Sequence, residues 1–121
     1  MTIQRFQSNA RMSGVVSHGG VLYLAGQVPG DLQGDITSQT RQVLAKIDGL
    51  LAEAGSDKTH LLSAQIWLKH IDRDFAAMNA VWDAWLPQGG SPARATVEAN
   101  LAHPEVLVEI MVIAARAELI S

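Results

Sequence analysis

The sequence contains no cysteine. Disulfide bonds, thiolate nucleophiles and zinc sites built on cysteine are therefore excluded. It also lacks an apolar run close to the ~20 residues of a membrane-spanning helix, and no apolar signal segment follows its first residue. From these absences we expect a cytoplasmic protein that has no membrane partner.

A concentration of basic charge is also absent. Nine lysine and arginine residues are scattered among twelve aspartate and glutamate residues, which gives a formal net charge of −3. Proteins that bind nucleic acid gather basic side chains on one face or along one segment. We therefore expect no nucleic-acid partner.

Motifs for metals, nucleophiles and cofactors are missing too. The four histidines, His18, His60, His70 and His103, do not have the spacing of metal ligands, and no H-E-x-x-H segment is present. The nucleophile motif G-x-S-x-G does not occur, and no G-x-G-x-x-G leads into a helix. The sequence therefore predicts a protein without a metal site or a bound cofactor.

What the chain does contain is enough apolar side chain for a folded core. It has 121 residues, of which 48% are hydrophobic and 17% are charged. This length suits one compact domain and is short for two, and the composition does not fit a disordered chain. We expect a single domain over residues 1–121, with no linker and no internal repeat.

Apolar residues recur at helical spacing in two segments. The pattern predicts helices over residues 35–55 and 72–86. Asp35 and Asp72 are expected as N-caps of the two helices, and Gly55 is expected just after the end of the first.

The remaining apolar segments predict strands separated by glycine and proline. Gly19 and Gly20 lie between two β-rich runs at the spacing of a hairpin turn. The strands are expected at residues 1–7, 12–18, 21–29, 60–71, 93–101 and 106–119. This order predicts an α+β fold in which a mixed sheet carries two helices on one face.

The last strand is apolar on both of its faces. Val108, Ile110, Val112 and Ala114 lie on one face, and Leu107, Met111, Ile113 and Ala115 lie on the other. A strand that is apolar on both sides needs cover on both sides. Two helices can cover only one face, so the second face predicts an interface with another subunit.

Two charged residues stand out on the last two strands. Arg94 begins a polar row just after a loop rich in glycine and proline, and Glu109 shares a face with apolar residues. A carboxylate in such a row is costly unless it is paired. One interpretation is a structural Arg94–Glu109 salt bridge at a subunit interface. The other is an anion-binding arginine in a pocket between subunits, because a planar guanidinium binds a small carboxylate through two hydrogen bonds.

Several segments resemble the Rid family, also called YjgF-like or RidA-like, the reactive intermediate/imine deaminases. The matching segments are YLAGQVP (23–29), QTRQVLAKIDGLLAEAG (39–55), DFAAMNAVWDAW (74–85) and PARATVEANLAHPEVLVEIMVIA (92–114). The last segment is the most specific, because it resembles the closing signature of the family: a P-A-R strand ending in V-E, a short turn, and V-E-I in the final strand.

This resemblance implies a chorismate-mutase-like α+β fold and a homotrimer with ligand clefts between its subunits. In the deaminating members, the arginine of P-A-R binds the carboxylate of a 2-imino or 2-enamino acid, and that position is Arg94. The glutamate of V-E-I, here Glu109, is associated with the same cleft. The asparagine of the second helix corresponds to Asn79. The resemblance implies neither a metal nor a cofactor.

The implied activity is hydrolytic deamination of imines and enamines such as 2-aminoacrylate to 2-keto acids and ammonia, as in a 2-iminobutanoate/2-iminopropanoate deaminase. Arg94 would hold the carboxylate, and Glu109 would orient or deprotonate water. The alternative is a non-catalytic trimer that binds small molecules or acts as a chaperone-like regulatory protein.

One segment departs from the family. Typical imine deaminases carry a G-P-Y segment before the second strand, and its tyrosine lines the cleft. The corresponding stretch here is RMSGVVSH (11–18), which has no tyrosine. Arg11, Ser13 or His18 is expected to form that wall, and we assign Arg11 and Ser13 to the substrate-binding set.

Overall fold

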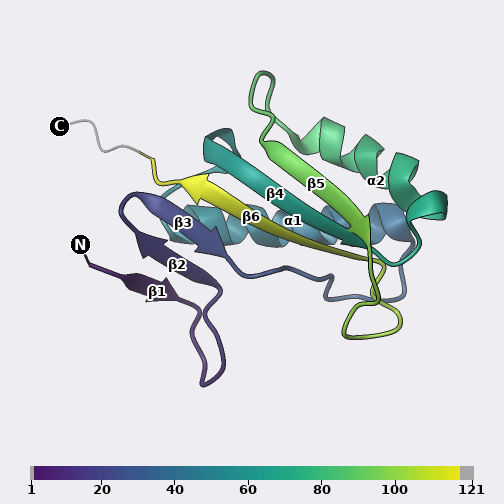
Figure 1. Ribbon diagram of the computed structural model, residues 1–121, viewed down its shortest axis with the longest axis horizontal. Helices are drawn as coiled ribbons and strands as arrows, with labels where there is room; N and C mark the ends of the chain where they lie inside the picture. Colours follow the sequence, from purple (N-terminus) through teal and green to yellow (C-terminus); the bar gives the residue numbers. More distant parts are fainter. Residues whose placement is uncertain (1, 118–121) are drawn as a thin grey trace.

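The computed structural model describes residues 2–117 and shows six strands and two α-helices (Figure 1). The order along the chain follows the sequence prediction, with a short 3-10 turn added at Lys58–His60. The elements are β1 (Gln4–Phe6), β2 (Val15–His18), β3 (Val21–Leu24), α1 (Ile36–Glu53), β4 (Leu61–Leu68), α2 (Ile71–Trp85), β5 (Ala93–Glu98) and β6 (Val108–Ala115).

All six strands form one mixed sheet in the order β1-β2-β3-β6-β4-β5. Only β4 and β5 pair in parallel, because α2 carries the chain from the end of β4 back to the start of β5. The last strand, β6, lies inside the sheet between β3 and β4. Strand β5 forms one edge of the sheet, and β1 forms the other.

The hairpin predicted at Gly19 and Gly20 is present between β2 and β3. Both glycines have positive φ, 62° and 79°, and His18 pairs with Val21 across the turn. Two consecutive residues with positive φ favour glycine and match the twist of the strands they join.

Helix α1 begins and ends as the sequence predicts. The Asp35 carboxylate accepts a hydrogen bond from the Ser38 N–H at 2.9 Å. Gly55 follows the last turn with a φ of +84°, a conformation that favours glycine. The buried side of α1 includes Val43, Leu44, Ile47 and Leu51, which belong to the predicted apolar stripe.

The predicted N-cap of the second helix is wrong. Helix α2 begins at Ile71, so Asp72 lies in its first turn, and the N-cap residue His70 makes no side-chain capping bond. The Glu98 carboxylate on β5 accepts from the Ile71 N–H at 3.0 Å instead. This cap comes from a strand that is distant in sequence, so the local pattern around α2 cannot reveal it.

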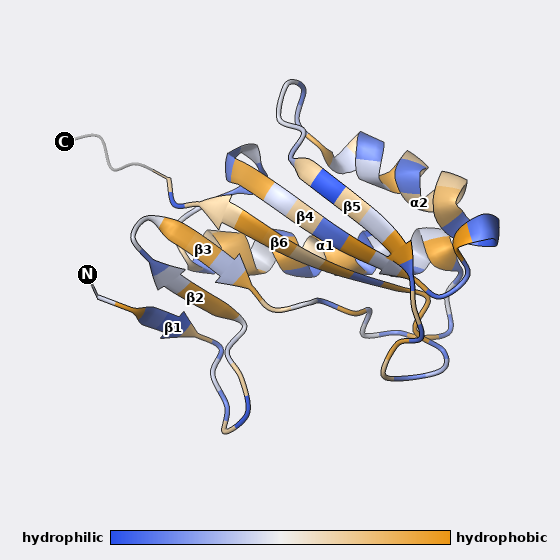
Figure 2. Ribbon diagram, viewed as in Figure 1, coloured by the Kyte–Doolittle hydropathy of each residue, from blue (hydrophilic) through white to orange (hydrophobic). Residues whose placement is uncertain are grey.

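Both helices pack on one face of the sheet. In β6 the alternation is strict: Val108, Ile110, Val112 and Ala114 are buried, and the residues between them are only half-buried. Figure 2 shows apolar residues along β3, β6 and β4, with α1 behind the sheet. We call the side away from the helices the open face. On β4, β5 and β6 it carries Ser63, Gln65, Trp67, Ala93, Ala95, Val97, Glu109, Met111 and Ile113.

The predicted strands are longer than the observed ones. The final strand ends at Ala115, and β5 ends at Glu98, after which the Ala99 N–H still donates to the Leu68 carbonyl of β4. The first predicted strand shortens to Gln4–Phe6. The predicted positions 1, 118 and 119 lie outside the described residues.

Gln39 yields a test of how the loops are held to the helical layer. Its fully buried side chain donates to the Glu105 carbonyl at 3.0 Å and accepts from the Leu107 N–H at 2.8 Å. Gln39→Leu should lower the free energy of unfolding by about 2–4 kcal/mol, because the partly buried Glu105 carbonyl and Leu107 N–H both lose their partner. Urea unfolding at one fixed protein concentration measures this.

The matched control is Gln42→Leu, one turn further along α1. Gln42 bonds to the exposed Asp31 backbone, which water can satisfy instead. This variant should lose less than about 1 kcal/mol. Equal losses in both variants would show that the Gln39 bonds are not what fixes these loops.

Candidate functional site

Arg94 lies near the start of β5 and extends toward the helices. In the register it pairs with Ala64, which in turn pairs with Val112, and both of these residues are buried under the helical layer. The guanidinium carbon of Arg94 lies over the Trp82 ring, 5.5 Å from its centroid. The arginine is therefore placed between the edge strand and α2.

Two features around Arg94 change the pKa of its guanidinium in opposite directions. Burial lowers the pKa of the guanidinium, and the nearby negative charge of Asp83 raises it. Because the ordinary pKa of arginine is above about 12, the group stays cationic at neutral pH. A partly desolvated cation gains more from a bound anion than a cation in bulk water does.

The backbone beside Arg94 is also available. The Ala99 N–H donates to the Leu68 carbonyl of β4. Backbone groups alternate in direction along a strand, so those of Arg94 and Thr96 point away from β4, at the free edge of the sheet. The Thr96 hydroxyl oxygen is buried and has no hydrogen-bond partner among the described residues.

Asn79 is placed consistently with this half of the site. It lies on α2, three and four residues before Trp82 and Asp83, so the three residues share a face of the helix. The Trp82 ring lies under Arg94, and the Asp83 charge raises the pKa of Arg94. We define the arginine half-site as Arg94, Thr96, Asn79, Trp82 and Asp83.

Glu109 lies on the open face, at the other side of the sheet. It pairs with Trp67 of β4, and its carboxylate lies against Gly26 in the chain after β3. A Cβ at position 26 would meet the Glu109 Oε2 at 2.2 Å, so the carboxylate would have to move. Gly26 therefore leaves the space that the carboxylate occupies. We define Glu109, Gly26 and Trp67 as the glutamate half-site.

The Glu109 carboxylate is partly desolvated. Burial raises the pKa of Glu109 above its usual range. Within residues 2–117, Glu109 has no ion pair and its carboxylate accepts no hydrogen bond. A carboxyl group in this state exchanges a proton more readily near neutral pH than an exposed one does.

The sheet separates the two halves of the site within one chain. Arg94 is on the helix side and Glu109 is on the open face, so they form no salt bridge in the chain. A salt bridge or a shared ligand between different subunits remains a prediction.

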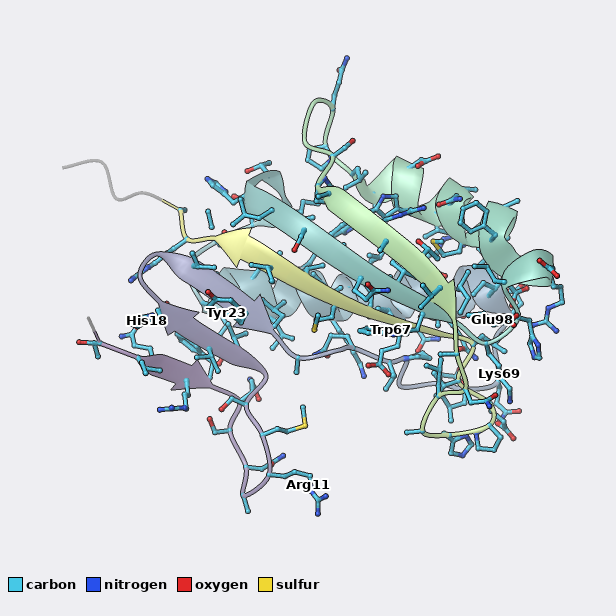
Figure 3. The ribbon with its side chains drawn as sticks, viewed as in Figure 1. Arg11, His18, Tyr23, Trp67, Lys69 and Glu98 are labelled. Carbon is cyan, nitrogen blue, oxygen red and sulfur yellow. The ribbon has the colours of Figure 1, made fainter. Side chains whose placement is uncertain are left out.

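The third group of predicted residues lies on the loop between β1 and β2. The Asn9 carboxamide oxygen accepts from the N–H groups of Arg11 and Met12 at 2.7 and 2.9 Å, and the Ser8 and Ser13 hydroxyls lie 2.8 Å apart. Figure 3 shows Arg11 at the tip of this loop, pointing away from the body of the chain, with His18 at the opposite end of β2. Between residues 2 and 117, no hydrogen bond or ion pair joins Arg11, Ser13 or His18 to Arg94 or Glu109.

Three residues that bear on the site were not assigned to it from the sequence. Gly26 was visible only as part of the YLAGQVP segment, and Trp82 only as part of an apolar helix stripe. Tyr23 lies on β3 beside Ile113, on the same face as Glu109, and is 46% exposed. It places a phenol on the open face, although the stretch 11–18 contains no tyrosine.

Pocket size alone does not identify this site. A hollow of about 380 Å³ on the open face is lined by residues of β4, β5 and β6 that include Gln65, Ala95 and Met111. A larger hollow of about 480 Å³ lies at the starts of the two helices. There Gln39 is fully used in structural hydrogen bonds, and the buried Asp74 carboxylate is paired with Arg73 at 2.8 Å. The polar side chains of Gln39 and Asp74 in the larger hollow are therefore already engaged in contacts within the chain.

Two further observations concern metals and membranes. In the stretch from Thr2 to Ala117, no three histidine, aspartate or glutamate side chains are grouped so that they would hold a metal ion. Neither of the α-helices in that stretch combines the length and apolar character needed to cross a membrane.

The fold and the two half-sites define an α+β protein with a partly buried arginine at a sheet edge and a desolvated carboxyl group on the opposite face. A family model described as Endoribonuclease L-PSP matches residues 2–116. A RutC family protein of Haemophilus influenzae is 47% identical over 115 residues, which cover 94% of this chain and 98% of that relative.

Solved structures agree with this match. A YjgF family protein from Neisseria meningitidis is 46% identical, with a TM-score of 0.95 and coverage of 98% of both chains. A protein of the Rid family from Yersinia pestis is 35% identical, with a TM-score of 0.82, covering 89% of this chain and 90% of that chain. The chain belongs to the Rid/YjgF family, as its sequence motifs predicted.

The raised pKa of Glu109 predicts a pH-dependent stability. The folded chain binds this proton more tightly than the unfolded chain, so stability falls as the pH rises from the unfolded pKa through the folded one. Glu109→Gln should melt at a higher temperature than the wild type at about pH 7.5, and this advantage should disappear below about pH 4. Thermal unfolding at both pH values measures the difference.

Glu53→Gln is the matched control, because Glu53 lies at the exposed end of α1. It should change the melting temperature little at either pH. A lower melting temperature for Glu109→Gln at neutral pH would contradict this prediction and would favour a salt bridge with the arginine of another subunit.

Proposed function

We propose that the protein hydrolyses reactive 2-imino and 2-enamino acids to 2-keto acids and ammonia, in clefts shared between the subunits of a homotrimer. The observation that carries the proposal is the state of Arg94. It is a partly buried cation at a sheet edge, held over an aromatic ring, and no carboxylate of residues 2–117 forms an ion pair with it.

Arg94 binds the substrate carboxylate in this proposal. A guanidinium presents parallel N–H donors that match the two oxygens of a carboxylate, and partial burial strengthens the contact. The backbone groups of Arg94 and Thr96 that point out of the same sheet edge form hydrogen bonds with the amine nitrogen. The Asn79 side chain on α2 adds a polar contact from the helix side. Together these groups fix the carbon that water attacks.

Glu109 moves the protons. Its raised pKa suits a group that accepts a proton from water as the oxygen bonds to the imine carbon. The substrate reacts as the iminium, whose nitrogen is already protonated, so the product is a neutral carbinolamine with the hydroxyl and the amine on one carbon. Glu109 then returns its proton to nitrogen. It takes the hydroxyl proton as the C=O bond forms and the C–N bond breaks, ammonia and the 2-keto acid leave, and transfer of that proton to ammonia restores the carboxylate. Each step conserves atoms and charge without a metal or a cofactor.

A shared site follows from the opposite placement of the two half-sites. One chain cannot bring Arg94 and Glu109 to one small ligand, because the sheet lies between them. The open face around Glu109 exposes apolar side chains, including Tyr23 and Val97, and such a face favours burial against other copies. When the open face of one subunit packs beside the β5 edge of the next, the two half-sites form a single cleft.

The second candidate function is non-catalytic binding. The same arginine half-site would hold a small carboxylate in a regulatory or chaperone-like trimer, and the wall that carries the family tyrosine differs here. Cleavage of RNA, which the description of the family model names, is less consistent with the net charge of −3.

Arg94 variants test the proposed reaction. An amino-acid oxidase generates the imino acid, and semicarbazide traps what the protein does not hydrolyse, so activity lowers the semicarbazone absorbance. Arg94→Ala should reduce kcat/KM by roughly 30- to 1000-fold while leaving the assembly intact. Arg94→Lys should also be poor, because lysine retains the charge but not the planar donor pair.

Arg41→Ala is the matched control, since Arg41 is exposed on α1 and belongs to neither half-site. Wild-type turnover by Arg94→Ala would exclude the carboxylate-binding role. Pyruvate binding by a wild-type protein that never lowers the semicarbazone signal would favour the non-catalytic alternative.

Mixed assemblies test whether the cleft is shared. Arg94→Ala and Glu109→Gln should each be inactive alone, but co-refolded one to one they should regain about a quarter of wild-type activity. Three quarters of randomly mixed trimers contain both chains, and each of these has one of its three clefts intact. Light scattering on the same samples should give the mass of three chains. No recovery on mixing would show that the site is not shared in this way.

A further inference from the structure

Two tryptophans lie side by side on α2, and Trp82 is the one whose ring lies under Arg94. Trp85 donates from its indole N–H to the Asp48 carboxylate at 3.0 Å, and the Lys58 ammonium lies 5.2 Å from its ring centroid. The rings of Trp85 and Trp82 are 5.5 Å apart at 42°. Trp82 is only 3% exposed, and Arg94 lies over its ring.

We infer that Trp82 is a positioning residue that presents Arg94 to the substrate carboxylate. The inference rests on the proposed function, in which Arg94 binds that carboxylate. The indole face attracts the cation and removes water from one side of it. The buried ring cannot move away, so the guanidinium is held before the substrate arrives, and less entropy is lost on binding.

An aromatic ring suits this role better than a carboxylate would. A carboxylate that neutralised Arg94 at contact distance would occupy two of its N–H donors, which are the donors that the substrate needs. The guanidinium carbon lies over the face of the ring, which does not accept hydrogen bonds as a carboxylate does. Asp83 acts on the charge of Arg94 without an ion pair, since none involves Arg94 between residues 2 and 117. The charge is thus stabilised while the donors stay available.

The test compares three variants of the two neighbouring tryptophans. Trp82→Leu removes the ring under Arg94, Trp82→Phe keeps an aromatic face, and Trp85→Leu is the matched control in the same helix. Pyruvate binding is measured by titration calorimetry, with melting temperatures recorded on the same samples. Pyruvate carries the carboxylate of the substrate and requires no turnover.

We expect Trp82→Leu to weaken pyruvate binding about 5- to 20-fold, the range of a desolvated cation–π contact. Trp82→Phe should remain within about 3-fold of the wild type. Trp85→Leu should lower the melting temperature as much as Trp82→Leu does, with the pyruvate affinity unchanged. In the imine assay, Trp82→Leu should raise KM more than it lowers kcat, because the ring acts on binding.

Equal weakening by Trp82→Leu and Trp85→Leu would overturn the inference, as would wild-type affinity in Trp82→Leu or a wild-type protein that does not bind pyruvate. Pyruvate binding that depends on Trp82, in a protein without turnover, would reject the proposed reaction but retain the inference.

A measurement on the wild type covers the case in which Trp82→Leu does not fold. The ring current of Trp82 should shift the Arg94 Nε–H proton resonance upfield, and this resonance is assigned by its loss in Arg94→Lys. An unshifted resonance would overturn the inference.

Discussion

Side chains alternate between the two faces of a strand, and in this protein that alternation sends Arg94 toward α2 and Glu109 toward the open face. The helical layer requires Val108, Ile110 and Val112 to point inward, so Glu109 must point outward. Shifting β6 by one residue would bury the glutamate under the helices and expose the core. The position of the acidic group is therefore fixed by the same packing that stabilises the fold.

The two half-sites share one electrostatic property. Burial disfavours the charged form of both groups, lowering the pKa of Arg94 and raising that of Glu109. An anion bound beside the arginine would therefore stabilise its charged form. A ligand beside the glutamate could exchange a proton with it. The chain supplies support that does not occupy the reacting atoms: an aromatic ring under Arg94 and the absence of a side chain at Gly26.

Local patterns predicted the order of the elements, the hairpin at Gly19 and Gly20, and the two ends of α1, because each of these depends on nearby residues. They also predicted which residues of the final strand share a face. The cap of α2 could not be found in this way, since Glu98 reaches Ile71 only after β5 has paired with β4.

The candidate site shows the same limit. Arg94 and Glu109 stood out because charge is unusual in their surroundings, and the family motif added Asn79. That the sheet separates the first two depends on strand register, which a period of two residues does not reveal across different strands. The relation of Gly26 to Glu109 and of Trp82 to Arg94 joins segments far apart in sequence. The assignment of Arg11 and Ser13 rests on the family resemblance alone, since no hydrogen bond between residues 2 and 117 joins them to Arg94 or Glu109.

The unpaired side of β5 has a consequence for handling the protein. A row of free N–H and C=O groups at a sheet edge is a template for pairing with any other extended chain. The exposed side chains Ala93, Ala95 and Val97 are small and uncharged, so they do not prevent such pairing. The single chain therefore presents an aggregation-prone edge. A second copy that covers this edge, as in the proposed assembly, would protect it, and dilution or a mild denaturant would expose it again.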